Sequence, residues 1–168
     1  MFIWQICVLL LNRQENANDE TDLIEPYDIE SIVVDEISNA FIQVPLNLDK
    51  IKVYDFQEDT IVLSGAVGKS GNTYIARFST SSCRICINHL MSDLQLHASA
   101  DSSASILVII SNAIPRDLNV FAAQYERRYE FYGAQEFPLD FDGGMTPAKF
   151  QVDTGGIVTE AKFYLPNN

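Results

Sequence analysis

Basic residues are scarce in this sequence, and the short motifs that identify many enzymes are missing. Only 11 Lys and Arg accompany 23 Asp and Glu, giving a formal net charge of −12. This charge argues against a broad basic surface for a phosphate backbone, so we expect no direct nucleic-acid binding. The chain has no G-x-S-x-G, and Leu63 stands where a phosphate loop ending in Gly68-Lys69-Ser70 needs its first glycine. The sequence therefore predicts no catalytic residue and no cofactor.

Cysteine and long apolar runs are also scarce. The three cysteines, Cys7, Cys83 and Cys86, are too few and odd in number for a secreted disulfide framework, and no Asn-x-Ser/Thr sequon occurs. Both observations favour a reducing compartment. The apolar run from Met1 to Leu11 is too short to span a bilayer and lacks a positively charged start, so we expect no membrane association. It reads instead as an arm that packs against another subunit.

Four soft ligands lie close together in sequence: Cys83, Cys86, His89 and His97. A zinc ion would suit these residue types, but a second CxxC or a pair of histidines at the usual spacing is absent. A redox CxxC would need a βαβ context, which the pattern does not indicate, and a strand would point the two cysteines to opposite faces. We therefore interpret Cys83 and Cys86 as ordinary packed cysteines and predict no metal site.

Short β-branched and aromatic runs dominate the middle of the chain and predict strands. A glycine-containing loop at 68–72 predicts a hairpin between two of them, and Thr154-Gly155-Gly156 predicts a second hairpin over 148–166. One run also fits a helix, because Ile87, Leu90, Met91 and Leu94 have helical spacing. The runs are 41–45, 51–56, 60–67, 73–79, 84–90, 94–98 and 106–110.

The segment 121–132 permits two interpretations. Its odd positions are mostly aromatic and its even positions from 124 to 130 are polar or charged, which is typical of a half-buried strand. Leu118, Phe121 and Tyr125 also have helical spacing, with Pro115 near a plausible helix start and Gly133 beyond a plausible end. The high content of Tyr and Phe favours the strand.

The predicted fold is all-β: an eight-stranded, jelly-roll-like sandwich at 40–138, because turn signals recur every eight to twelve residues. An N-terminal arm with a possible short helix at 25–38 occupies 1–39, and a C-terminal loop and hairpin occupy 139–168.

The segment Asn119 to Pro138, NVFAAQYERRYEFYGAQEFP, resembles the closing strand of picornavirus-like coat proteins, and the preceding SILVIISN resembles its neighbouring strand. The resemblance implies a single jelly roll that acts by assembly, with copies of itself or other capsid proteins as partners. It implies a structural virion protein, assembled in the host cytoplasm, and not an enzyme.

On this interpretation the apolar arm and the C-terminal hairpin make the contacts between subunits. The alternative functions are a β-sandwich that binds a ligand such as a carbohydrate and, third, a small hydrolase on a β-scaffold. The predicted inter-subunit contact residues are Phe2, Ile3, Trp4, Val8, Leu9, Leu10, Phe150, Val152, Ile157, Phe163 and Tyr164.

Overall fold

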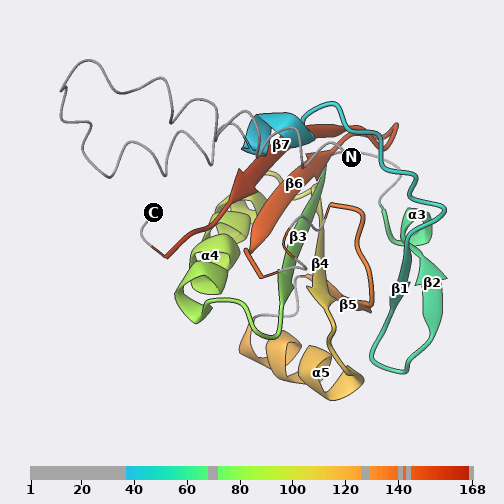
Figure 1. The fold of residues 1–168 in the computed structure, drawn as a ribbon, viewed down its shortest axis with the longest axis vertical. Helices are drawn as coiled ribbons and strands as arrows, with labels where there is room; N and C mark the ends of the chain where they lie inside the picture. Colours follow the sequence, from blue (N-terminus) through green and yellow to red (C-terminus); the bar gives the residue numbers. More distant parts are fainter. Residues whose placement is uncertain (1–36, 68–71, 126–128, 140–141, 143–144, 167–168) are drawn as a thin grey trace, which may run out of the picture. The chain divides into compact units, whose positions relative to one another are not determined.

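The computed structural model describes residues 37–67, 72–125, 129–139, 142 and 145–166 (Figure 1). The predicted arm at 1–39 and its short helix therefore lie almost wholly outside the described residues, although residues 37–41 are helical. The same holds for the predicted contact residues between Phe2 and Leu10. Within the described ranges, no helix combines the length and apolarity needed to cross a membrane.

The described strands form one mixed sheet of seven strands, in the order β2-β1-β5-β4-β3-β6-β7. The central strands β3, β4 and β5 run parallel to one another, and the outer strands pair antiparallel. The elements are β1 (Lys52–Tyr54), β2 (Thr60–Val62), α3 (Leu63–Ala66), β3 (Thr73–Ser79), α4 (Arg84–Ala100), β4 (Ser105–Ser111), α5 (Pro115–Gln124), β5 (Glu130–Ala134), β6 (Ala148–Val152) and β7 (Val158–Phe163).

Two helical crossovers connect the parallel strands: α4 joins β3 to β4, and α5 joins β4 to β5. Parallel strands are covered on both faces, so they read as continuous apolar runs instead of alternating ones. The sequence of β4, SILVIIS, fits this rule, and all seven residues of β3 are buried. The strands predicted at 73–79 and 106–110 are therefore confirmed.

The strands predicted at 84–90 and 94–98 are wrong, because both runs lie in the single helix α4. Its buried residues Cys86, Ile87, Leu90, Met91 and Leu94 recur at intervals of one, three and four, which places them on one helical face. The helical alternative noted for Ile87 to Leu94 is the correct one. The segment 84–100 also contains no Gly or Pro to interrupt a helix.

The strand interpretation of 121–132 is also wrong for its first part, since α5 continues to Gln124 and β5 begins only at Glu130. The helix starts with Pro115 at its first position, and the Asp117 carboxylate accepts a hydrogen bond from the Ile114 N–H at 3.0 Å. Aromatic residues are tolerated here because Leu118 and Phe121 pack against the sheet. Tertiary packing thus outweighs the β-propensity of Tyr and Phe.

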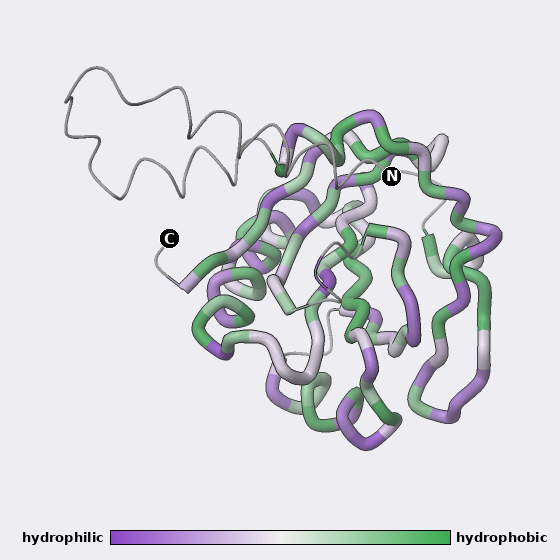
Figure 2. The backbone as a smooth tube through the Cα atoms, in the orientation of Figure 1, coloured by the Kyte–Doolittle hydropathy of each residue, from purple (hydrophilic) through white to green (hydrophobic). Residues whose placement is uncertain are grey.

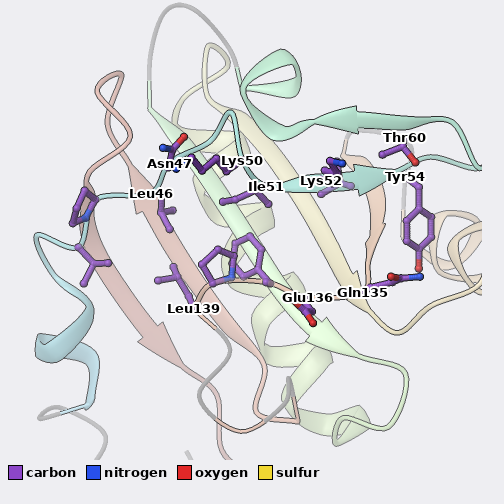
Figure 3. A pocket seen from close by; sticks show the side chains of 15 residues that line it. Leu46, Asn47, Lys50, Ile51, Lys52, Tyr54, Thr60, Gln135, Glu136 and Leu139 are labelled. Carbon is purple, nitrogen blue, oxygen red and sulfur yellow. The ribbon is translucent and has the colours of Figure 1, made fainter. Parts of the chain in front are cut away.

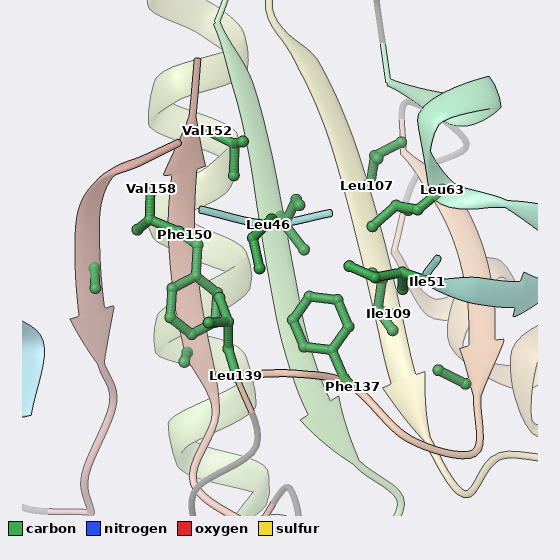
Figure 4. Close-up of a cluster of buried hydrophobic side chains, with 14 of the residues drawn as sticks. Leu46, Ile51, Leu63, Leu107, Ile109, Phe137, Leu139, Phe150, Val152 and Val158 are labelled. Carbon is green, nitrogen blue, oxygen red and sulfur yellow. The ribbon is translucent and has the colours of Figure 1, made fainter. Parts of the chain in front are cut away.

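The sheet separates two apolar cores. Figure 2 colours the backbone by the hydropathy of the residues that contribute to them. One core lies beneath α4 and α5, where Leu90, Leu94 and Leu118 meet the side chains of β3 and β4. The other lies on the opposite face, where Ile75, Ile109 and Phe150 are covered by α3 and by two irregular segments (Figure 4). These segments are residues 44–51 and residues 135–139.

The all-β jelly roll is therefore wrong: the chain forms a mixed α/β structure with helices between its parallel strands. The hairpin predicted through 68–72 is wrong as well, because β2 pairs with β1 while β3 pairs with β4 and β6. No strand forms at 41–45, which contains only an isolated bridge from Pro45 to Ile157.

The C-terminal hairpin predicted at 148–166 is present as β6 and β7. Gly156 in its turn has φ +79°, and a Cβ there would lie 2.8 Å from the Leu46 carbonyl oxygen. A glycine is required on both counts. Strand β6 pairs with β3 along its whole length, so the hairpin is part of the main sheet.

Candidate functional site

Cys83 and Cys86 lie where β3 passes into α4, at the edge of the sheet where the parallel strands end (Figure 1). Cys83 is the N-cap of α4, and Cys86 is the third residue of the helix. One helical turn therefore places both cysteines at the same end of the helix. The N–H groups of the first turn have no partner within the helix and give this end a positive partial charge.

The two thiols differ in exposure and acidity. Cys83 is partly exposed and Cys86 is 1% exposed. A side-chain hydrogen bond from Cys86 lowers the pKa of Cys83, and the backbone N–H groups of Cys86 and Ile85 lower it further. Burial raises the pKa of Cys86 to about 11, with the hydrogen bond to Cys83 and its charge as further causes. The site thus pairs an accessible, more acidic thiol with a buried, protonated one.

A hydrogen-bonded turn that contains Ser79, Ser81 and Ser82 directly precedes Cys83. The Ser79 N–H donates to the Ser82 hydroxyl at 2.9 Å, and the Ser79 and Ser81 hydroxyls are also 2.9 Å apart. Ser79 is 3% exposed and is the last residue of β3, so the turn is anchored in the centre of the sheet. The helix begins at once behind it, where the Ile87 N–H donates to the Cys83 carbonyl at 3.0 Å.

The structure does not bring the four soft ligands together. His97 follows Cys86 by eleven residues along one helix, which corresponds to about 16 Å. Its ring instead stacks on Tyr74 with a centroid separation of 4.6 Å. Among the described residues, no group of three or more His, Cys, Asp and Glu has a geometry that could hold a metal ion.

A second polar cluster, which we call the Lys149 cluster, joins the middle of α4 to the C-terminal hairpin. The Lys149 side chain is 2% exposed, and its Nζ lies 2.8 Å from Asp93 Oδ2, 3.2 Å from Glu160 Oε1 and 2.7 Å from His97 Nε2. A lysine ammonium only donates hydrogen bonds, so His97 Nε2 is the acceptor in its contact with Lys149.

Asp93 is the common acceptor of the Lys149 cluster. The Tyr164 hydroxyl donates to Asp93 Oδ2 at 2.5 Å, and Lys162 lies 3.7 Å from Oδ1. Burial alone would raise the pKa of Asp93, but the hydrogen bonds from Lys149 and Tyr164 and the two lysine charges hold it below its usual value. Burial and the bond to Asp93 raise the pKa of Tyr164.

The predicted contact residues of the hairpin are largely buried within one copy of the chain. Phe150 and Val152 are fully buried, Phe163 and Tyr164 nearly so, and Ile157 is half-buried. Phe150 packs edge-on against Phe163 at 6.0 Å between ring centroids. These side chains contribute to the two cores described above.

Similarity to known proteins is found in the structure and not in the sequence. No family model matches the sequence, and no curated protein matches it either. Among solved structures, the C-terminal domain of a proposed thiol-disulfide oxidoreductase from Bacteroides thetaiotaomicron is similar, with a TM-score of 0.57 and 12% identity over 72% of this chain and 86% of that one. The peroxidoxin BcpB from Mycobacterium tuberculosis gives a TM-score of 0.55 and 15% identity over 73% and 86%. A thioredoxin-like protein from Porphyromonas gingivalis gives 0.51 and 16% over 68% and 78%.

The fold is thioredoxin-like. The resemblance to picornavirus-like coat proteins is therefore wrong: the stretch 105–138 on which it rested forms β4, α5 and β5 of a thioredoxin-like sheet. The predictions of a structural virion protein, of a non-enzyme and of a virion location are corrected with it, since the similar structures are named as a proposed thiol-disulfide oxidoreductase and a peroxidoxin and not as coat proteins. The alternative of a ligand-binding β-sandwich fails because the chain is not a sandwich.

The structure supplies the βαβ context that the sequence pattern around Cys83 and Cys86 does not indicate, because β3, α4 and β4 form such a unit. The available signal was the helical spacing of Ile87, Leu90, Met91 and Leu94 directly behind the cysteines. Lys149 and Asp93 gave no signal, because 56 residues of sequence separate them.

Proposed function

We propose that this protein is a thiol–disulfide oxidoreductase that uses the Cys83–Cys86 pair. The observation that carries the proposal is the asymmetry of the two thiols at the start of α4: one accessible with a lowered pKa, one buried with a raised pKa. The thioredoxin-like fold and the similarity to a proposed thiol-disulfide oxidoreductase support it. The similar structures support the fold, and the two cysteine side chains carry the proposed chemistry.

The thiolate of Cys83 is the nucleophile in this proposal, because only a thiolate attacks a disulfide efficiently and Cys83 is the more acidic and accessible group. It attacks one sulfur of a substrate disulfide, forms a mixed disulfide and releases the other substrate sulfur as a thiolate. The N–H groups at the start of α4 favour the negative charge on Cys83 before attack.

Cys86 completes the exchange. Its thiol gives its proton to the departing substrate thiolate and attacks the Cys83 sulfur, so that a Cys83–Cys86 disulfide forms and the substrate leaves as a dithiol. Two electrons pass from the cysteine pair to the substrate, and the reverse sequence oxidises a substrate dithiol. Cys86 stays protonated at neutral pH because its pKa is about 11, which keeps it from competing as the first nucleophile.

The direct test is equilibration of a Cys7→Ser background in glutathione buffers of graded redox potential. Mass spectrometry after alkylation should show a two-electron transition that links Cys83 to Cys86. The reduced protein should also reduce the disulfides of insulin. Absence of a Cys83–Cys86 disulfide across the whole range of buffers would refute the proposal.

Two single variants separate the roles of the cysteines. Cys86→Ser should accumulate a stable mixed disulfide with a substrate, because the attack that resolves it is removed. Cys83→Ser should form none with the same substrate. Ser102→Ala, at an exposed position of the loop between α4 and β4, is the control, since it keeps both thiols and the serine turn and should retain a complete redox transition.

A further inference from the structure

A groove lies on the face of the sheet opposite α4 and α5, between two irregular segments of the chain. Residues 44–54 form one side and residues 135–139 the other, and the space between them measures about 920 Å³ (Figure 3). Its floor is apolar, because the buried side chains of Leu46, Ile51, Phe137 and Leu139 meet there (Figure 4). Its rim carries Lys50 and Lys52 on one side and Glu136 on the other, all three exposed.

The groove exists because the sheet separates at this point. Strand β1 pairs with β5 through one residue pair only, Tyr54 with Gly133. The next pair in the same antiparallel register would be Lys52 with Gln135, and it does not form. The segment before Tyr54 and the segment after Gly133 therefore diverge, and each lines one side of the groove.

Backbone groups of β1 point into this opening. The Leu63 N–H donates to the Ile51 carbonyl and the Asp55 N–H to the Asp59 carbonyl. Odd-numbered residues in and beside β1 therefore direct their backbone groups toward β2. Even-numbered residues face the other way, because backbone groups alternate along a strand. The N–H and C=O of Lys52 thus face the groove, and no backbone partner for them occurs among the described residues.

We propose that the groove binds an extended polypeptide segment that inserts as an additional strand between β1 and residues 135–137. The N–H and C=O of Lys52 face the groove and need hydrogen-bond partners. An extended peptide can supply them, because its own N–H and C=O groups alternate along its edge. This site is separate from the cysteine pair, and the inference does not depend on redox chemistry.

The register also specifies the side chains of the bound segment. A residue that pairs with Lys52 places its side chain on the same face of the sheet as the lysine, and opposite charges at paired positions attract. Lys50 lies in the turn before β1, where its N–H donates to the Asn47 carbonyl at 2.9 Å, and its ammonium adds a second positive charge on the same side of the groove. These charges favour acidic residues in the bound segment. Between them, residues opposite Ile51 and Val53 face the apolar floor. The occupant is therefore a strand that alternates acidic and β-branched apolar residues.

The probe is the capped pentapeptide Glu-Val-Glu-Val-Glu, titrated into isotope-labelled full-length protein at 0.15 M salt, where surface charges farther apart than about 8 Å are largely screened. Saturable binding with shifts of the Lys52 and Gln135 amide resonances is the expected result. The capped Lys-Val-Lys-Val-Lys peptide should bind more weakly. Equal or tighter binding of the basic peptide, or no saturable binding at millimolar concentration, would overturn the proposal.

Two further measurements isolate strand pairing from general attraction. A Glu-Val-Glu-Val-Glu peptide with N-methylated glutamate amides cannot donate along one edge and should lose binding; unchanged affinity would rule out strand insertion. Lys50→Gln combined with Lys52→Gln should weaken binding about fivefold, because one cross-strand charge pair and one further attractive charge at the groove are removed. Lys162→Gln, an exposed lysine on β7, is the matched control and should leave the affinity unchanged. Peptide-induced shifts confined to the α4–α5 surface would contradict the assignment.

Discussion

Replacing Lys149 with Met tests whether the Lys149 cluster holds the C-terminal hairpin against α4. Methionine keeps most of the side-chain volume but removes the ammonium that contacts Asp93, Glu160 and His97. Asp93 would then lose its nearest cation while it remains only 20% exposed. The variant therefore isolates the electrostatic part of the contact from its packing.

The expected loss can be bounded from the structure. Removing one partner of a fully buried ion pair costs about 3–5 kcal/mol. Here Asp93 keeps the Tyr164 hydroxyl and Lys162 as partners, and Glu160 is 47% exposed and can be solvated. We therefore expect the free energy of unfolding to fall by about 2–3 kcal/mol.

Urea denaturation measures this loss as a lower midpoint at an unchanged slope. Lys162→Met is the control: its amine is 51% exposed and 3.7 Å from Asp93, so we expect a loss below about 1 kcal/mol. A double-mutant cycle with Asp93→Asn should show coupling between Lys149 and Asp93. A Lys149→Met protein as stable as the parent would refute the reasoning, because it would mean that burying the charges costs as much as their attraction returns.

Three further predictions concern other parts of the chain. Gly156→Ala should lower the unfolding free energy by about 2 kcal/mol, because the position has a positive φ and a Cβ there would meet the Leu46 carbonyl. Gly65→Ala is the control and should not lower it, since no atom lies within 4 Å of a Cβ there. Urea midpoints of the two variants measure the difference. Alkylation by iodoacetamide, mapped by mass spectrometry, should label Cys83 with a midpoint below pH 9 and Cys86 only near pH 11; equal profiles would contradict the assigned roles. The raised pKa of Tyr164 means that its contribution to stability is present below about pH 10 and is lost at higher pH, so Tyr164→Phe should flatten the alkaline limb of a stability–pH curve; an unaltered alkaline limb would exclude this role.

Local sequence patterns predict the strands well where a run is apolar and bounded by turn residues. The strands at 73–79 and 105–111 and the C-terminal hairpin are examples, because continuous β-branched runs and a Gly-Gly turn carry their signal locally. The helices carry weaker signals. In α4 the exposed faces include Ile85 and Leu96, so the apolar stripe is blurred and the segment also resembles two short strands.

One wrong element assignment accounts for most of the wrong fold. With residues 84–98 read as strands, Cys83 and Cys86 point to opposite faces and the chain appears all-β. With the same residues helical, both cysteines lie in one turn and a βαβ unit is complete. The Lys149 cluster could not be predicted in either case, because β6, β7 and α4 meet only through the long-range pairing of β6 with β3.

The single residue pair between β1 and β5 has a consequence for hydrogen exchange. Strand β3 is paired with β4 along its whole length and with β6 from Thr73 to Arg77, so its amides should exchange only when the whole sheet unfolds. Among the described strands, the β1–β2 hairpin pairs with the rest of the sheet through the single pair of Tyr54 and Gly133, and its amides can exchange by detachment of this hairpin at lower free energy. The cysteines follow directly after the slowest-exchanging strand, and the proposed groove borders the fastest, so ligand binding there can reorganise the hairpin while the thiols stay in place.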